Sequence, residues 1–263
     1  MKNVIIVRGG GDIASGVIHK LHRSRFPVLI LECAQPTAIR REVSFCEAVY
    51  DGESFVEGVL CEKIADISEC EEVWKKGEIP LLVDAAGDSI RQMKPFVVVD
   101  AILAKKNLGT AMDMAPLTIG LGPGFTAGDD VHYAIETMRG HNLGRIIEEG
   151  EPMPNTGIPG EIGGYGAQRV IHAPSGGVFE GVHKIGDWVE AGQTIARIGN
   201  APVPASITGV LRGILRNGLT VPAGMKMADI DPRKGEKENC FTISDKARCI
   251  AGSVLELVVR EMG

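Results

Sequence analysis

The chain begins with a strand that leads directly into a glycine-rich loop and then into a helix, and few folds accommodate this order. Val4–Val7 predict a buried strand, and Gly9-x-Gly11-x-x-Ala14 has the G-x-G-x-x-G/A spacing of dinucleotide-binding turns. In such turns the first glycine permits a tight turn, the second lets a pyrophosphate approach the backbone, and the small third residue lets helix and strand pack closely. We therefore expect the N–H groups at the start of this helix to bind a nucleotide phosphate. A tight turn without a ligand is the simpler alternative.

Charged residues flank this loop. Glu32 follows a second predicted strand, Pro27–Leu31, at the distance where an acid binds the ribose of a dinucleotide. Arg8 precedes the glycines, and a buried arginine there needs either an acidic partner or the anion of a ligand. Arg40 and Arg41 either bind a 2′-phosphate near the crevice or begin a solvated helix, so the choice between NAD and NADP stays open. The candidate cofactor-binding residues are Arg8, Gly9, Gly10, Gly11, Asp12, Ala14, Glu32, Arg40 and Arg41.

The overall charge and the cysteines exclude several classes of protein. The net charge is −6 at pH 7 and no basic stripe with interleaved aromatic residues occurs, which argues against nucleic-acid binding. The six cysteines show no C-x-x-C spacing, so we expect no metal site. The early apolar run is too short for a signal peptide or a membrane span, so we expect a cytoplasmic protein with reduced thiols. Cys33 could serve redox or selenium chemistry, although a packed thiol is the commoner role.

Residues 1–150 alternate apolar, strand-like runs with helical or loop stretches. The strand candidates are Val4–Val7, Val28–Leu31, Pro80–Val83, Phe96–Val99 and Leu117–Gly120. Most of these runs are continuously apolar, which is typical of parallel strands that are covered on both faces. We expect the α/β fold class, with a Rossmann-like parallel sheet as the nucleotide-binding domain at 1–150. Asp100 is expected to cap a helix that carries Lys105 and Lys106.

A glycine-rich region then extends from Gly120 to Gly166. It carries more charged and amide side chains than a flexible linker does, so we expect ordered loops that help to form a site, with residues 151–170 as a connection. No residue can be assigned a catalytic role from the sequence. The candidate substrate or loop residues are Lys105, Asn107, Asp129, His132, His141, Asn142 and Glu161.

The following region contains an internal repeat with an offset of 32 residues. Matched positions include Ala173 with Ala205, Gly177 with Gly209, Val189 with Val221 and Ile198 with Ile230. Two such halves resemble the lipoyl/biotinyl-carrier domain, which implies a C-terminal all-β barrel-sandwich domain at 171–232. That family carries its cofactor on a lysine between the halves, whereas the equivalent turn, Gly199–Pro202, has none, and Lys226 aligns with Thr194. We therefore expect no covalent lipoate or biotin, but an interaction or dimerisation module. Residues 233–263 should form a helix that packs back on the first domain.

Longer strings carry a more specific resemblance. RGGGDIASG, QPTAIRREVSF, DAILAKKNLGT, APLTIGLGPGFTAG, ETMRGHNLGR, NTGIPGEIGGY, GMKMADIDPR and ISDKARCIAG occur in this order. Together they resemble the YqeB-type family, accessory proteins of selenium-dependent molybdenum hydroxylase systems. The resemblance covers essentially the whole chain and implies a cytoplasmic maturation factor whose partner is a molybdenum hydroxylase client. It provides no catalytic residues.

Two functions follow from these patterns. The first is an accessory or maturation protein that binds a nucleotide, or a nucleotide-bearing cofactor such as a molybdopterin dinucleotide, without turnover. The second is a free-standing NAD(P)-dependent oxidoreductase, in which His132, His141 or Lys105 would face the nicotinamide. A domain that serves only as a scaffold is a third possibility. We expect a small nucleotide ligand and no nucleic acid or membrane as partners, and a homo-oligomer is possible.

Overall fold

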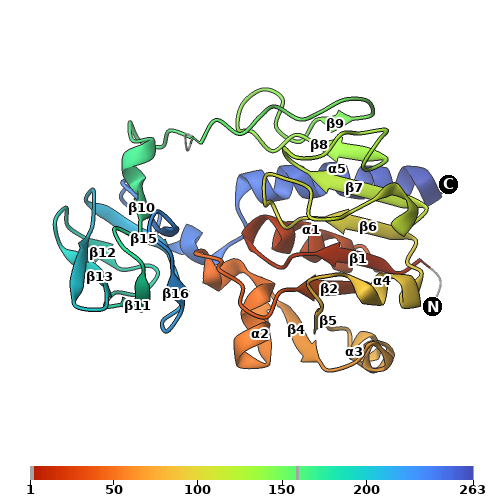
Figure 1. Cartoon of the computed structure of the whole chain (residues 1–263), viewed down its shortest axis with the longest axis horizontal. Helices are drawn as coiled ribbons and strands as arrows, with labels where there is room; N and C mark the ends of the chain where they lie inside the picture. Colours follow the sequence, from red (N-terminus) through yellow and green to blue (C-terminus); the bar gives the residue numbers. More distant parts are fainter. Residues whose placement is uncertain (1–2, 158–159, 263) are drawn as a thin grey trace. The chain divides into compact units, whose positions relative to one another are not determined.

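The predicted apolar runs form the middle of a large sheet (Figure 1). The computed structural model describes residues 3–157 and 160–262. Within these residues the sheet has nine strands in the order β3-β4-β5-β2-β1-β6-β7-β8-β9. Their bounds are Ile5–Arg8 (β1), Val28–Glu32 (β2), Glu53–Val56 (β3), Val59–Ile64 (β4), Ile79–Val83 (β5), Val97–Asp100 (β6), Leu117–Leu121 (β7), Tyr133–Ile135 (β8) and Ile146–Ile147 (β9). From β4 across to β8 neighbouring strands run parallel, whereas β3 and β9 pair antiparallel at the two edges.

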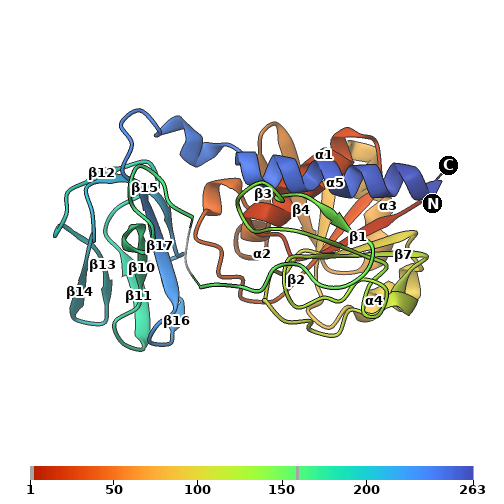
Figure 2. The same ribbon diagram turned by 90° about the horizontal axis from the view of Figure 1, so that it is seen from above.

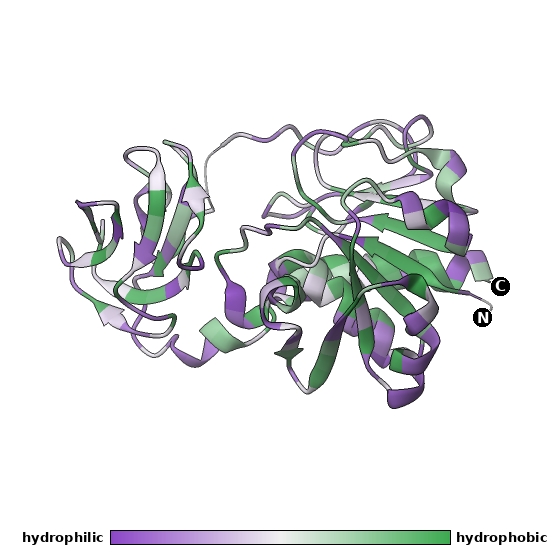
Figure 3. Ribbon diagram, turned by 60° about the horizontal axis from the view of Figure 1, so that its bottom comes forward, coloured by the Kyte–Doolittle hydropathy of each residue, from purple (hydrophilic) through white to green (hydrophobic). Residues whose placement is uncertain are grey.

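Helices cover both faces of this sheet. The α-helices are Asp12–Arg23 (α1), Ala48–Asp51 (α2), Cys70–Lys76 (α3), Asp88–Met93 (α4) and Asp245–Met262 (α5). Val4 and Ile6 of the β1 region pack in one cluster with Val73 of α3 and Ile90 of α4, so α3 and α4 cover that face. The helices α1 and α5 lie side by side on the sheet, as Figures 1 and 2 show. Figure 3 shows the strands between these layers as largely hydrophobic.

The chain divides into two compact units. The first unit contains the large sheet and comprises residues 3–36, 44–156 and 243–262 of the described chain, so the C-terminal helix α5 belongs to it. The second unit comprises residues 37–43, 157 and 160–242. Short 3-10 turns occur at Arg41–Val43, Phe45–Glu47, Ile67–Glu69, Met112–Met114, Ala167–Arg169 and Glu238–Phe241. No helix among the described residues has the length and apolar character needed to cross a membrane.

The described part of the second unit consists of two four-stranded antiparallel sheets. One has the order β10-β17-β15-β12 and the other the order β14-β13-β11-β16. The strands are Val170–His172 (β10), Gly177–Gly181 (β11), Trp188–Val189 (β12), Thr194–Ile198 (β13), Ala201–Pro204 (β14), Gly209–Ile214 (β15), Thr220–Val221 (β16) and Lys226–Asp231 (β17). The 32-residue repeat of the sequence places β11 and β15, and likewise β13 and β17, at matching positions of the two sheets.

The predicted fold class is wrong in its description of both regions. The large sheet is mixed rather than parallel, so it is not the predicted Rossmann-like parallel sheet. The second unit contains two antiparallel sheets and includes the distant segment 37–43, so it is not the predicted lipoyl/biotinyl-like barrel-sandwich at 171–232. The five apolar runs do form strands, but the edge strands β3 and β9 and the short strand β8 beside β9 were not among the predicted runs. Hydrophobic runs locate buried strands, whereas strand direction at an edge depends on contacts between segments that are distant in the sequence.

Candidate functional site

Charged residues end three neighbouring strands of the large sheet. Arg8 ends β1, Glu32 ends β2 and Asp100 ends β6, and the register places Arg8 opposite both Leu31 and Asp100. The strand β1 lies between β2 and β6, so the strand order reverses at this point. In open sheets of parallel strands, ligands bind outside the carboxyl ends of the strands where the order reverses. These three residues therefore mark the edge of the sheet at which a ligand site is expected.

The glycine loop between β1 and α1 is closely packed on one side and open on the other. Gly9 has a φ of +95°, and a Cβ atom built there would lie 3.0 Å from the backbone oxygen of Ala101. A Cβ on Gly10 would lie 2.9 Å from the backbone nitrogen of Cys46. A Cβ on Gly11 would meet no atom within 4 Å. Two of the glycines are therefore needed for packing, and the third, at the start of α1, leaves the backbone accessible.

The start of α1 has the features expected of an anion site. Gly11 is the N-cap residue, and no side chain caps the helix among the described residues. The first N–H groups of a helix have no partner within the helix and carry the positive end of its dipole. Ala14, the third small position of the motif, is fully buried and lets α1 approach the strand. The geometry at Gly11, Asp12 and Ala14 thus agrees with the local structure that the motif predicts.

Glu32 holds the loop rather than pointing away from it. One oxygen of its carboxylate accepts the N–H of Gly10 at 2.8 Å, and the other accepts the N–H of Cys33 at 2.8 Å. Burial raises the pKa of the Cys33 thiol to about 11, and the neighbouring charge of Glu32 acts in the same direction. The thiolate is the reactive form of cysteine, so this environment disfavours redox chemistry at Cys33 near neutral pH.

The side chain of Arg8 is buried and has partners within the protein. Its guanidinium donates to Thr110 Oγ1 at 2.5 Å and to the backbone oxygen of Ala85 at 3.1 Å, and it lies 3.7 Å from Asp100 Oδ2. Thr110 Oγ1 in turn donates to Asp100 Oδ2 at 2.6 Å. Burial raises the pKa of Asp100, while the hydrogen bonds from Thr110 and Ile102 and the charge of Arg8 act against that shift. Arg8 was expected to meet either an acidic partner or the anion of a ligand, and in the structure it lies beside the acid Asp100.

The segment after β6 is an irregular loop, so the prediction of a helix capped by Asp100 is wrong. Leu103 and Lys105 have φ values of +58° and +62°, which an α-helix does not allow. The Asp100 carboxylate instead accepts the N–H of Ile102 at 3.1 Å. The carboxamide of Asn107 closes the end of the loop, because its oxygen accepts the N–H groups of Gly109 and Thr110, both at 2.8 Å. Asn107 therefore positions the threonine that joins Arg8 to Asp100.

A lysine that the sequence analysis did not single out lies near the start of α1. Lys246 is half-buried, and a Cβ built on Gly16 of α1 would lie 2.7 Å from Cβ of its neighbour Ala247. Burial lowers the pKa of Lys246, the nearby charges of Arg139 and Lys105 lower it further, and Asp12 and Glu136 oppose the shift. Cationic groups from three distant segments thus gather at this end of α1. Nothing in the local sequence around Lys246 indicates this, because the cluster depends on how α5 packs.

Other residues fix the loops around this cluster. Arg139 makes two hydrogen bonds to Asp245, of 2.8 and 2.9 Å, which tie the loop after β8 to the start of α5. The carboxylate of Glu136 is buried and accepts the N–H groups of Met138 at 2.6 Å and Met153 at 2.7 Å. The glycine-rich region is therefore ordered by specific hydrogen bonds over its described part in the first unit.

The remaining candidates in the first unit lie elsewhere. The N–H of Thr118 donates to Nδ1 of His132 at 3.1 Å, and the Thr118 hydroxyl lies 2.8 Å from the same nitrogen. Thr118 comes two residues before Gly120, which pairs with Asp100, so His132 lies away from the edge that carries the glycine loop. Asp129 lies in a turn whose backbone donates to the oxygen of Thr126. His141 and Asn142 are exposed in the turn between β8 and β9.

Three candidates belong to the second unit. The Arg40 guanidinium donates to the backbone oxygens of Asn239 and Thr242, both at 3.0 Å, and Nε of Arg41 donates to the oxygen of Ile214 at 2.9 Å. Glu161 is exposed in the same unit. The structure therefore does not bring Arg40, Arg41 and Glu161 together with the glycine loop in one compact unit, and the two arginines stabilise segment 37–43. Among the described residues, no group of three or more His, Cys, Asp or Glu side chains is arranged to hold a metal ion.

Comparison with known proteins identifies one curated relative. The chain is 49% identical to the uncharacterized protein YqeB of Escherichia coli (strain K12) over 259 residues, which is 98% of this chain and 48% of that protein. The chain is similar to YqeB. The resemblance expected from the sequence strings is thus confirmed over nearly the whole chain, which spans about half the length of this relative. No profile of a known protein family matches.

Solved structures give weaker likenesses. The product-bound ectoine utilization protein EutE (DoeB) from Ruegeria pomeroyi has a TM-score of 0.27 at 14% identity, covering 87% of this chain and 85% of its own. An aspartoacylase family protein from Mesorhizobium loti has a TM-score of 0.29 at 12% identity, covering 89% and 86%. A succinylglutamate desuccinylase/aspartoacylase from Rhodobacter sphaeroides has a TM-score of 0.28 at 16% identity, covering 87% and 85%.

Proposed function

We propose that the first unit binds a nucleotide, or the nucleotide part of a cofactor such as a molybdopterin dinucleotide or NAD(P), at the start of α1. The observation that carries this proposal is the open side of Gly11 at an uncapped helix N-terminus, located where the strand order reverses. Backbone N–H groups in this position suit a phosphate because they offer both hydrogen bonds and the positive end of the helix dipole.

The cationic cluster supports the same ligand. Lys246 interacts electrostatically with Arg139, Lys105 and Asp12, and Asp12 is the first residue of α1. A phosphate bound at the start of α1 would gain from the positive charges of Lys246, Arg139 and Lys105, whereas the Asp12 carboxylate would act against it. Glu32 would act by holding Gly10 in place, rather than by binding the ribose of the ligand.

We further propose that the protein is an accessory or maturation protein for a selenium-dependent molybdenum hydroxylase. The similarity to YqeB supports this role through the family that the sequence strings indicate. In this role the bound cofactor is cargo, the client enzyme is the partner, and the antiparallel sheets of the second unit provide a surface for the client. Binding without independent turnover is the expected behaviour.

A thermal-shift and calorimetric comparison of NAD, NADP, ATP, CTP and a molybdopterin dinucleotide tests the proposal. A ligand present at 100 times its dissociation constant should stabilise the protein by about 2.7 kcal/mol. The Gly11→Val variant should lose this stabilisation while its own unfolding free energy stays close to that of the parent, because a Cβ atom at Gly11 meets no protein atom within 4 Å. Gly252→Ala, at a second open glycine in α5, is the matched control and should keep full binding.

The outcomes separate the proposed roles. Selective binding of the molybdopterin dinucleotide supports the maturation role. Binding of NAD or NADP alone, together with hydride transfer, would favour the oxidoreductase instead. If no nucleotide binds the parent protein, or if Gly11→Val binds as well as the parent does, the site at the start of α1 is refuted.

A further inference from the structure

A second candidate site extends from the amino ends of the strands towards Gly87, which follows β5. A cavity of about 890 Å³ is bordered by the residues that precede three parallel strands, namely Val4 before β1, Phe96 before β6 and Pro116 before β7. Its other wall is the helix α4, through Asp88 and Arg91. The cavity exists because the described connection from β6 to β7 contains only a short 3-10 turn and no α-helix that would cover this face. Its volume lies within the range of small-molecule sites.

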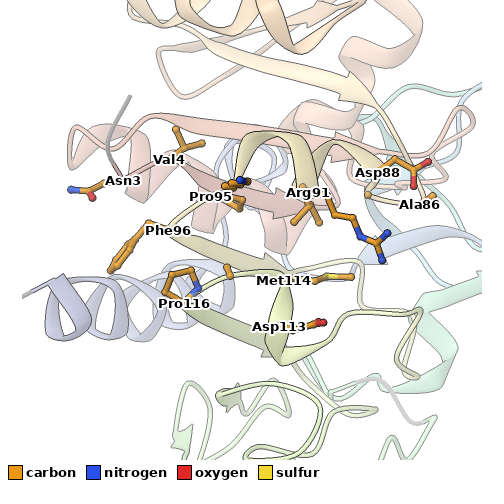
Figure 4. A pocket seen from close by; sticks show the side chains of 14 residues that line it. Asn3, Val4, Ala86, Asp88, Arg91, Pro95, Phe96, Asp113, Met114 and Pro116 are labelled. Atoms are coloured by element: carbon orange, nitrogen blue, oxygen red, sulfur yellow. The ribbon is translucent and has the colours of Figure 1, made fainter.

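The two ends of this cavity differ in chemistry (Figure 4). Phe96 and Pro116 lie at one end and present an aromatic ring and a proline ring. At the other end Arg91 reaches from α4 into the opening above Met114, and Asp113 lies below it. A ligand that fills both ends therefore needs an apolar body and a polar head.

The charges along the cavity are balanced and available. Arg91 and Lys94 are the cationic side chains of its lining, and Asp88 and Asp113 are the anionic ones. All four side chains are exposed, and within the described residues none of them forms an ion pair. A balanced set of this kind favours neither a simple anion nor a simple cation. It does suit a molecule that carries one charge of each sign.

We propose that this cavity binds a small zwitterion with an apolar body, the chemical class of the hydrophobic α-amino acids. The carboxylate would pair with the Arg91 guanidinium, and the ammonium group would pair with Asp113. The apolar side chain would lie against Phe96 and Pro116. This site is separate from the glycine loop, and neither site requires that the other be occupied.

Three small molecules test each part of the proposal by calorimetry or by saturation-transfer NMR on the full chain. L-phenylalanine carries both charges, 3-phenylpropionate lacks the ammonium group, and 2-phenylethylamine lacks the carboxylate. L-phenylalanine should bind at least roughly fivefold more tightly than either analogue, because each exposed ion pair adds a modest increment. Equal binding of all three, or no binding of L-phenylalanine, would overturn the proposal.

Variants assign each charge to its partner. Arg91→Gln should weaken the binding of L-phenylalanine and of 3-phenylpropionate by roughly fivefold and leave the binding of 2-phenylethylamine unchanged. Asp113→Asn should weaken the binding of L-phenylalanine and of 2-phenylethylamine only. Arg23→Gln, at an exposed arginine of α1 that does not line the cavity, is the matched control and should change nothing. If Arg91→Gln binds none of the three ligands while its unfolding curve is unchanged, the assigned pairing is contradicted. Phe96→Ala should weaken all three ligands, and retention of full affinity there would also refute the proposed orientation.

Discussion

Two groups of charged residues lie close to the glycine loop, and they differ in how far the protein satisfies them. Arg8, Thr110 and Asp100 are buried and bonded to one another. Lys105 and Lys246, near the start of α1, repel each other and lie in a more open environment. The first group holds loops at the end of the sheet, and the second stays half-buried or exposed beside the opposing charges of Asp12 and Glu136. The comparison separates residues that stabilise the protein from residues that are available to a ligand.

The strongest test of this comparison is removal of the acid in the buried group. Asp100→Ala leaves the Arg8 guanidinium buried without its carboxylate, so the free energy of unfolding should fall by about 3–5 kcal/mol. Urea unfolding followed by circular dichroism measures this loss. Asp113→Ala removes an exposed carboxylate and should change the stability little. A loss below about 1 kcal/mol in Asp100→Ala would place Asp100 among the ligand-binding residues rather than the structural ones.

The packed side of the glycine loop provides the second test. In Gly10→Ala the new methyl group would lie 2.9 Å from the backbone nitrogen of Cys46, so we expect a loss of about 1–3 kcal/mol from overpacking. Gly11→Ala, where the methyl group meets nothing, should change stability by less than about 1 kcal/mol, because the entropy gain and the poorer N-cap preference of alanine oppose each other. The same urea titration compares the two variants. Equal effects would mean that the two sides of the loop do not differ as described.

A smaller loss is expected at the turn that positions Thr110. Asn107→Ala removes the carboxamide that accepts two backbone N–H groups, so we expect a loss of about 1 kcal/mol. Hydrogen exchange of the amide of Thr110 should become faster, because its N–H loses its acceptor. Asp129→Ala, in another loop of the same unit, is the comparison. Unchanged exchange at Thr110 would show that the turn is held by other contacts.

The smallest effect, and the one with a pH dependence, is expected at Lys246. The pKa of Lys246 is lowered in the folded protein, so the unfolded chain binds its proton more readily, and this group lowers stability at neutral pH. The penalty disappears as the pH rises through the lowered pKa towards the unfolded value. Lys246→Met should therefore be slightly more stable than the parent at pH 7, and the gain should shrink towards pH 10.

Thermal unfolding across this pH range measures the difference. Lys75→Met, at an exposed lysine of α3, is the control. The Lys246→Met variant should also bind any phosphate ligand more weakly, which separates the open group of charges from the buried one. A stability loss at pH 7 in this variant would instead place Lys246 with the structural residues.

Several elements of the first unit could be predicted from the sequence. The apolar runs around Ile6, Leu29 and Val98 formed strands because continuous burial of side chains requires continuous hydrophobicity. The glycine loop could be located because tight turns and close backbone contacts admit only glycine, as at Gly9. The identity of the fold could not be obtained in this way, since the antiparallel edge strands carry no distinct pattern.

The residues of the site were less predictable than the strands. Asp100 looked like a helix cap because an acid after a strand commonly begins a helix, yet its carboxylate bonds to Thr110, ten residues later in the chain. Arg40 and Arg41 follow the second strand in sequence, but segment 37–43 belongs to the other unit, where their guanidinium groups hold backbone oxygens. A charged residue alone does not show which distant partner will neutralise it.

The sequence by itself determined where buried strands and the open glycine turn occur, because these features depend on local hydrophobicity and on local backbone freedom. Only the tertiary structure decided which charges are paired and which remain available. Arg8 lies beside Asp100 of the neighbouring strand β6, whereas Lys246 lies near the start of α1 because α5, from the far end of the chain, packs there. Charge pairing acts over a few ångströms in space, and two residues that lie so near each other can be far apart in the sequence.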